Sequence, residues 1–118
     1  MSKTERTKKI LQACIGNPQK LADLTEYSND SIVSKTIIDK PVGTITLFAF
    51  DKGQSLSEHT TPCDAVVEVV QGRTQLTIGG VEKEICSGEI IIMPANVPHS
   101  VFAIERFKML LTMIRERT

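Results

Sequence analysis

The sequence predicts an all-β protein, built as an antiparallel sandwich or barrel. About nine short segments rich in β-branched and aromatic residues follow one another between residues 32 and 114. Turn-forming residues separate these segments at short, regular intervals, and no crossover helix lies among them. The predicted strands are 32–38, 44–50, 56–60, 64–70, 73–78, 81–86, 90–93, 99–104 and 107–114.

A different pattern precedes the strands. We expect residues 1–30 to form an N-terminal helical arm and residues 31–115 to form the barrel domain. A helix is predicted over residues 4–14, because its apolar residues recur at helical spacing. A short turn is predicted at residues 21–24. The apolar residues of the predicted helix are Ile10, Leu11 and Cys14.

Within the barrel, two local patterns are informative. Gly79 and Gly80 separate two predicted strands by two residues, which is typical of a β-hairpin. Alternation along residues 64–70 places Ala65, Val67 and Val69 on one face, which we expect to be the inner one. The last strand, 107–114, is apolar on both faces and should be largely covered on both.

Composition and charge exclude several classes of protein. Fourteen basic residues balance fourteen acidic ones, which leaves no basic footprint for nucleic acid and no polybasic membrane anchor. No apolar run approaches the roughly 20 residues of a membrane-spanning helix. The three cysteines are far apart, so neither a disulfide framework nor a structural zinc site is expected. We expect a soluble, cytoplasmic protein.

The two histidines of the chain lie in two similar stretches. The first stretch, residues 53–72, begins with Gly53, carries His59 and ends with Gly72. The second begins with Gly88 and reaches His99 through a rigid loop that contains two prolines. Each stretch therefore combines a glycine, a predicted strand and one histidine.

These stretches resemble the two motifs of the cupin superfamily. In the first motif, Gly53, His59 and Gly72 match, whereas Thr61 stands at the position of a second histidine and Ala65 at that of a glutamate. The resemblance covers about half of the chain. It implies a small single-domain cupin, whose fold is a double-stranded β-helix, or jelly-roll barrel.

The second motif is also matched in part. Gly88, Pro94 and His99 agree with it, whereas Asn96 stands for a glycine and Ala103 for an asparagine. Asparagine tolerates a left-handed backbone better than most residues, so Asn96 should preserve the local turn.

The resemblance implies a metal site at the barrel mouth, but this chain keeps only part of it. The family's ligands are three histidines and a glutamate, of which His59 and His99 remain. One divalent ion (iron, manganese, nickel or zinc) and no metal at all are both compatible with that pair. Cys63 and Asp64 are candidate replacement ligands, although alternation directs Asp64 away from the inner face.

A mostly apolar pocket is expected behind the histidines. Alternation and the family register predict that the side chains lining it point into the barrel. With the two histidines, the expected pocket residues are Thr61, Ala65, Val67, Leu76, Met93, Phe102 and Met109.

Three functions stay open at this point. The chain could be a binding module for a small, largely apolar ligand, with a depleted metal site. It could instead be a metal-dependent oxygenase or isomerase that uses His59 and His99 with water or an unusual ligand. A purely structural dimer is the third possibility. We expect a homodimer in each case, with the apolar strand 44–50 between two sheets and the N-terminal segment reaching the partner.

Overall fold

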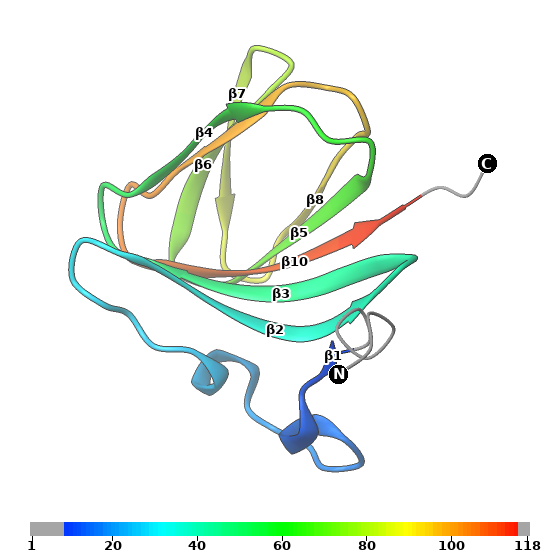
Figure 1. Ribbon diagram of the computed structural model, residues 1–118. Coiled ribbons are helices and arrows are strands. Elements are labelled where there is room, and N and C mark those ends of the chain that lie inside the picture. The colour runs from blue at the N-terminus through cyan, green and yellow to red at the C-terminus, as the bar shows by residue number, and fades with distance from the viewer. Residues whose placement is uncertain (1–8, 116–118) are drawn as a thin grey trace.

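The barrel is formed by two antiparallel sheets that face each other (Figure 1). The computed structural model describes residues 9–115. The strands are β1 Lys9–Ile10, β2 Ile32–Lys40, β3 Gly43–Phe50, β4 Ser55–His59, β5 Asp64–Gln71, β6 Arg73–Ile78, β7 Val81–Cys86, β8 Ile90–Met93, β9 His99–Phe102 and β10 Phe107–Ile114. One sheet has the order β1-β2-β3-β10-β5-β8, and the other has the order β4-β9-β6-β7.

This architecture confirms the predicted double-stranded β-helix. The nine predicted strands are present as β2 to β10, and their ends differ from the prediction by no more than two residues. Among residues 9–115, no helix is long and apolar enough to cross a membrane.

The predicted helix over residues 4–14 is wrong for its described part. Lys9 and Ile10 form β1, which pairs with β2, and a single 3-10 turn follows at Gln12–Cys14. Residues 4–8 lie outside the described range. The free edge of β2 offers hydrogen bonds to this segment, and the Leu11 amide donates to the Ile37 carbonyl at 2.8 Å. A short isolated helix is only marginally stable, so edge pairing prevails. The turn predicted at residues 21–24 is confirmed as the 3-10 turn Leu21–Leu24.

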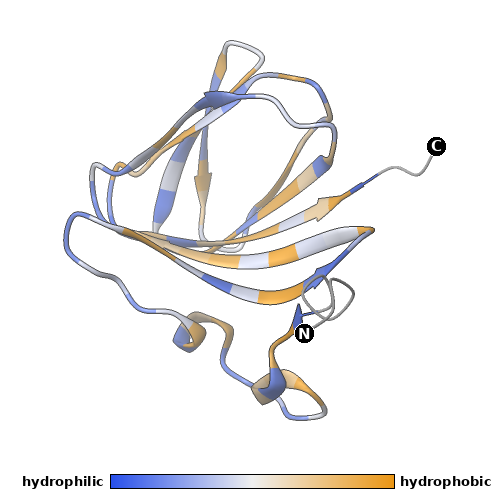
Figure 2. Cartoon of the chain, in the orientation of Figure 1, coloured by the Kyte–Doolittle hydropathy of each residue, from blue (hydrophilic) through white to orange (hydrophobic). Residues whose placement is uncertain are grey.

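The core fills the space between the sheets. Ala65, Val67 and Val69 are at most 2% exposed, which confirms the predicted alternation of β5. Phe107 and Met109 of β10 join the same core, and Phe107 stacks on another phenylalanine of β3. Figure 2 shows apolar residues recurring along the strands of the larger sheet. Burial of these side chains is the main force that closes the barrel.

Two turns depend on a left-handed backbone. Gly79 and Gly80 have φ values of 57° and 81°, as a tight two-residue hairpin requires, and the predicted β6–β7 hairpin is confirmed. Asn96 has φ 65°, a left-handed backbone that asparagine tolerates better than most residues, in agreement with the expected turn.

The arm before β2 runs along the outer side of the larger sheet (Figure 1). Lys108 of β10 points toward it and is only 7% exposed. Its Nζ donates to the carbonyl oxygens of Ala22 at 2.5 Å and Thr25 at 2.7 Å, and it lies 5.0 Å from the centre of the Tyr27 ring. This lysine therefore joins the arm to the sheet.

Candidate functional site

The two histidines meet at one end of the barrel. They come from β4 and β9, which pair antiparallel with His59 opposite His99. The register shifts between Leu56 and His59, so the strand is irregular just before the first histidine. The two imidazole rings meet edge to face, with centroids 4.4 Å apart and planes at 69°.

The two rings differ in burial. His99 is 3% exposed, whereas His59 is exposed at the rim. Each ring places Nδ1 against a main-chain carbonyl two residues earlier: His59 on Ser57 at 2.9 Å and His99 on Val97 at 3.1 Å. The two Nε2 atoms face each other at 3.2 Å. One histidine is therefore reachable from solvent and the other lies behind it.

These three polar contacts require more protons than two neutral rings possess. A carbonyl oxygen only accepts, so each Nδ1 must carry a proton to bond it. A neutral imidazole has one ring proton, so both Nε2 atoms are then unprotonated. Their lone pairs face each other, and no arrangement of two protons satisfies all three contacts. The pair is thus one hydrogen-bond donor short.

The histidines belong to a rim that we call the mouth, formed by the pair and the loops 60–63, 79–80 and 94–98. Hydrogen bonds join these loops: the Asn96 amide donates to the Thr61 carbonyl at 2.8 Å, and the Gly79 amide donates to the Pro98 carbonyl at 2.8 Å. Ile78 lies opposite His99 in the sheet. The mouth is consequently a connected frame around the two rings.

The other candidate metal ligands do not complete a set. Within residues 9–115, no cluster of three or more His, Cys, Asp or Glu side chains is placed to hold a metal ion. Cys63 is 2% exposed and part of the buried apolar set. The Asp64 carboxylate accepts a hydrogen bond from the Ala95 amide at 2.9 Å and so fixes the loop before β9. Tight divalent sites usually take three or four protein ligands, so these residues do not fit one.

Most of the expected pocket residues are buried in the barrel. Ala65 is the first inward residue of β5 and pairs with Met93 and with Met113. Thr61 is half-buried in its loop, and its Oγ1 accepts from the Cys63 amide at 3.3 Å. Deeper in the barrel, four expected pocket residues are at most 3% exposed and belong to the packed core: Val67, Leu76, Met93 and Met109.

The sequence predicted that Phe102 points into the barrel, and this prediction is wrong. Its side chain is 44% exposed, whereas Val101 beside it is buried. The reason is strand parity: His99 faces inward, and residues an odd number of positions away in the same strand face the other side. Phe102 is three positions from His99, so it is not a pocket residue.

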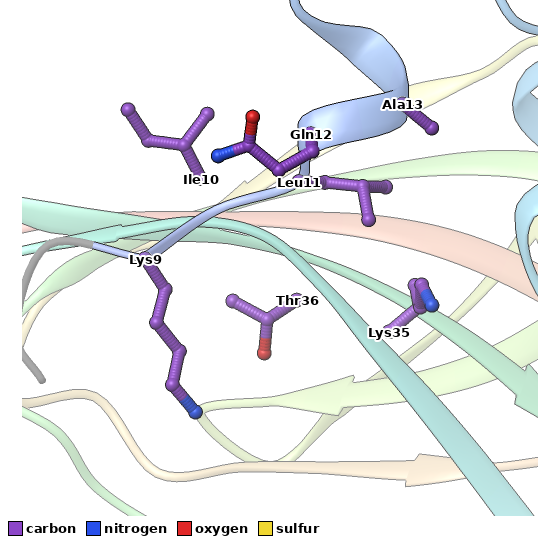
Figure 3. A pocket seen from close by; sticks show the side chains of 7 residues that line it. All are labelled: Lys9, Ile10, Leu11, Gln12, Ala13, Lys35 and Thr36. Carbon is purple, nitrogen blue, oxygen red and sulfur yellow. The ribbon is translucent and has the colours of Figure 1, made fainter.

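Several hollows lie away from the mouth, and two of them border β1 and β3. Figure 3 shows one beside β1, where Lys9 and Lys35 extend from neighbouring strands. The other is an apolar groove of about 430 Å³ at the start of β3 and the end of β10. Its lining includes Val42, Ile45 and Ile114. Neither hollow contains a histidine, so neither extends the paired site.

Sequence reasoning did not identify the groups that orient the histidines. The carbonyls of Ser57 and Val97 lie within hydrogen-bond distance of the Nδ1 atoms, and the Asp64 carboxylate accepts from a loop amide. Ile78 borders His99 from the neighbouring strand. A main-chain carbonyl is present at every residue, so the sequence does not show which one contacts a histidine. In both cases, however, the carbonyl belongs to the residue two positions before the histidine.

Comparison with known proteins identifies the fold family. Residues 46–114 match the conserved cupin domain. A conserved protein of unknown function from Streptococcus pyogenes is 31% identical, with a TM-score of 0.83 over 86% of this chain and 90% of that one. A cupin superfamily protein from Desulfitobacterium hafniense is 26% identical, with a TM-score of 0.83 over 94% and 99%.

A third similar structure is longer than this chain. It is a cupin 2 conserved barrel domain protein from Leptotrichia buccalis, 39% identical with a TM-score of 0.77, and the match spans 80% of this chain but 46% of that one. No curated protein matches the chain. The two glycine–histidine stretches, the barrel and these matches agree, and the chain belongs to the cupin family.

Proposed function

We propose that this protein binds a small molecule at the mouth of its barrel, with the polar group of the ligand on His59 and His99. The observation that carries the proposal is the missing donor between the two Nε2 atoms, which are 3.2 Å apart. His99 is buried, and buried polar groups normally have a hydrogen-bond partner. A ligand that donates a hydrogen bond would supply what the pair lacks.

The apolar interior of the barrel supports the remainder of the proposal. Ile78 lies opposite His99 in the sheet, and Ala65 pairs with Met93 in the buried core. None of the three has a charged or hydrogen-bonding side chain. A few polar groups above an apolar floor are typical of small-molecule sites. A small, largely apolar ligand with one polar end fits this arrangement.

A metal-dependent oxygenase or isomerase is the second candidate. The observation in its favour is that both Nε2 atoms are free to act as ligands, because both Nδ1 atoms bond to carbonyls. The observation against a tight site is the lack of a third protein ligand among the described residues. Water would have to complete the coordination of such an ion.

Elemental mass spectrometry on tag-free protein separates the two candidates. The matched control is the double variant His59→Ala, His99→Ala. The binding module predicts little metal in either protein, even after incubation with iron, manganese, nickel and zinc salts, together with thermal stabilisation of the wild type by small ligands. Near-stoichiometric metal in the wild type that disappears in the variant would contradict the module and support the enzyme.

We also propose that the chain forms a homodimer through the outer face of its larger sheet. Three exposed apolar residues belong to strands of this sheet, Ile90 and Ile92 of β8 and Ile114 of β10, and Val42 lies in the turn between β2 and β3. Each is between 54% and 63% exposed. Exposed apolar side chains that gather on a surface are typical of an interaction site. Light scattering at micromolar concentration should give twice the chain mass of 13.0 kDa, and Ile92→Lys with Ile114→Lys should give the monomer. A monomeric wild type would refute the dimer and leave the ligand site untouched.

A further inference from the structure

The outer edge of β2 is open for much of its length. The two-residue strand β1 and the Leu11 amide cover only the end near Asp39. Between residues 9 and 115, no other main-chain hydrogen bond is made to this side of β2. In an antiparallel pair, alternate residues direct their N–H and C=O groups away from the partner strand. The segment 32–36 therefore offers a row of unused main-chain donors and acceptors.

This part of the edge is only lightly protected. Natural proteins usually protect an open edge with proline, with charged side chains or with a covering element. β7, the edge strand of the smaller sheet, follows this rule with three consecutive charged residues, 82–84. The segment 32–36 has no proline and one charged residue, Lys35, and its residues 34–36 are exposed. Another chain can therefore reach it.

Two hollows lie along the open edge and share Lys35. One, of about 580 Å³, is bounded by residues 9–13 and reaches Thr36 (Figure 3). The other, of about 690 Å³, is bounded by residues 23–28 of the arm and reaches Val33. We call the open edge with these two hollows the edge groove. An added strand would lie about 4.8 Å from β2, on the side where the groove provides space.

The two ends of the edge groove differ in charge. Lys9 lines the first hollow, Lys35 lines both, and Asp23 and Glu26 line the second. Among residues 9–115, none of these four side chains takes part in an ion pair. The groove is therefore basic toward Thr36 and acidic toward the start of β2.

We infer that the edge groove binds an extended segment of another protein, which adds a strand antiparallel to β2 and in line with β1. Unpaired strand edges recognise extended peptides in this way, through main-chain hydrogen bonds. An antiparallel segment enters near Thr36, so an acidic side chain toward its N-terminus faces Lys9 and Lys35. A basic side chain toward its C-terminus faces the acidic end. The segment 32–36 of a second copy fits less well, because it contains no acidic residue.

Two peptides of identical composition test the assigned charge pattern. The first is acetyl-Ser-Glu-Val-Thr-Val-Lys-Ser-amide, and the second is its isomer in which Glu and Lys exchange places. Binding is measured by titration in proton–nitrogen NMR spectra at low ionic strength. We expect the first peptide to shift the amide signals of residues 32–36. It should bind about tenfold more tightly than the isomer, because the exchange replaces exposed attractions by repulsions.

Backbone N-methylation tests the main-chain hydrogen bonds directly. Each methyl group removes one N–H donor and leaves the side chains unchanged. The first peptide is made in two methylated forms, each carrying methyl groups on alternate residues, in opposite phase. Only one phase directs its N–H groups at β2, so methylation in that phase should weaken binding at least about tenfold and methylation in the other should be tolerated.

One variant and one control complete the design. Lys35→Glu changes an exposed side chain that lines both hollows, and it should remove the preference for the first peptide. Lys83→Glu makes the same change on the exposed strand β7 and should leave the preference intact. The amide spectra of the two free variants show whether both remain folded.

A preference that depends on Lys35 but not on Lys83, with one methylation phase tolerated, supports the inference. Equal affinity for the two isomers, equal affinity for the two methylated forms, or no binding at millimolar concentration would overturn it. Slow exchange of all amides of residues 32–36 without peptide would also overturn it, because the chain itself or a second copy would then cover the edge. Each of these results leaves the small-molecule site at the mouth untouched.

Discussion

Substitution of Gly72 by alanine tests how the barrel is closed between β5 and β6. Gly72 has φ 76°, and a Cβ at this position would overlap the carbonyl oxygen of Arg106 and crowd Phe107. Phe107 is fully buried in the core and cannot move aside without disturbing the packing. Gly72→Ala therefore combines a strained backbone with a steric overlap.

Gly80 provides a matched control. It has φ 81°, but a Cβ there would meet nothing within 4 Å. Gly80→Ala should therefore lower the free energy of unfolding only by the cost of a left-handed backbone, about 1–2 kcal/mol. Gly72→Ala should lower it by the same amount and by about 1–3 kcal/mol more, because the added Cβ is overpacked. The difference between the two variants, about 1–3 kcal/mol, measures the steric overlap alone.

Equilibrium unfolding in urea provides the assay. Far-UV circular dichroism is the suitable signal, because the chain has no tryptophan. The reasoning predicts that the transition midpoint falls further for Gly72→Ala than for Gly80→Ala, with similar slopes for both. If both variants lose the same free energy of unfolding within about 0.5 kcal/mol, the close approach to Arg106 does not constrain the fold and the argument fails.

Three further predictions concern the arm and the titratable side chains. Lys108→Ala removes two hydrogen bonds of a charged group, so the free energy of unfolding should fall by about 1–3 kcal/mol and amide exchange in the arm should become faster. Lys108→Met should give the same faster exchange with a smaller loss of stability. The hydrogen bond from Arg106 lowers the pKa of Asp51, so the ionised Asp51 carboxylate stabilises the folded state above the ordinary aspartate range. This stabilisation is lost as pH falls below about 4. In urea unfolding, Asp51→Asn should therefore reduce the fall in the free energy of unfolding at acid pH. Desolvation and neighbouring carboxylates raise the pKa of Cys86, so Ellman's reagent should modify this thiol only as pH rises above the usual thiol range. Cys63 is buried, so the reagent should reach it only when the protein unfolds. Equal modification rates for the two thiols would contradict both expectations.

The barrel could be predicted because its signals are local. Alternation placed Ala65 and Val67 inside, and the pair Gly79 and Gly80 marked a hairpin, since only a few residues tolerate the required backbone. The failure at Phe102 was one of parity, because the position of His99 already fixed which residues of that strand face inward. The predicted N-terminal helix failed because a partner far along the chain, the edge of β2, determined the structure of that segment.

The site could be predicted only in part. Spacing identified His59 and His99 as the important pair, and the structure places them in contact. The missing proton could not be inferred, because it depends on two main-chain carbonyls and on a ring separation of a few ångströms. The same holds for Lys108, whose partners are carbonyls of the arm more than 80 residues earlier in the chain.

The most direct test of the account is the protonation of the two rings. Long-range proton–nitrogen correlation spectra of ligand-free protein at about pH 8, with assignments from His59→Ala, identify which nitrogen of each histidine carries the proton. The account predicts that both neutral rings are protonated at Nδ1 and bare at Nε2. A proton on Nε2 of either ring would mean that the two rings bond each other and that one of the two carbonyl contacts lacks its donor, and the argument for a donor added by a ligand would fail.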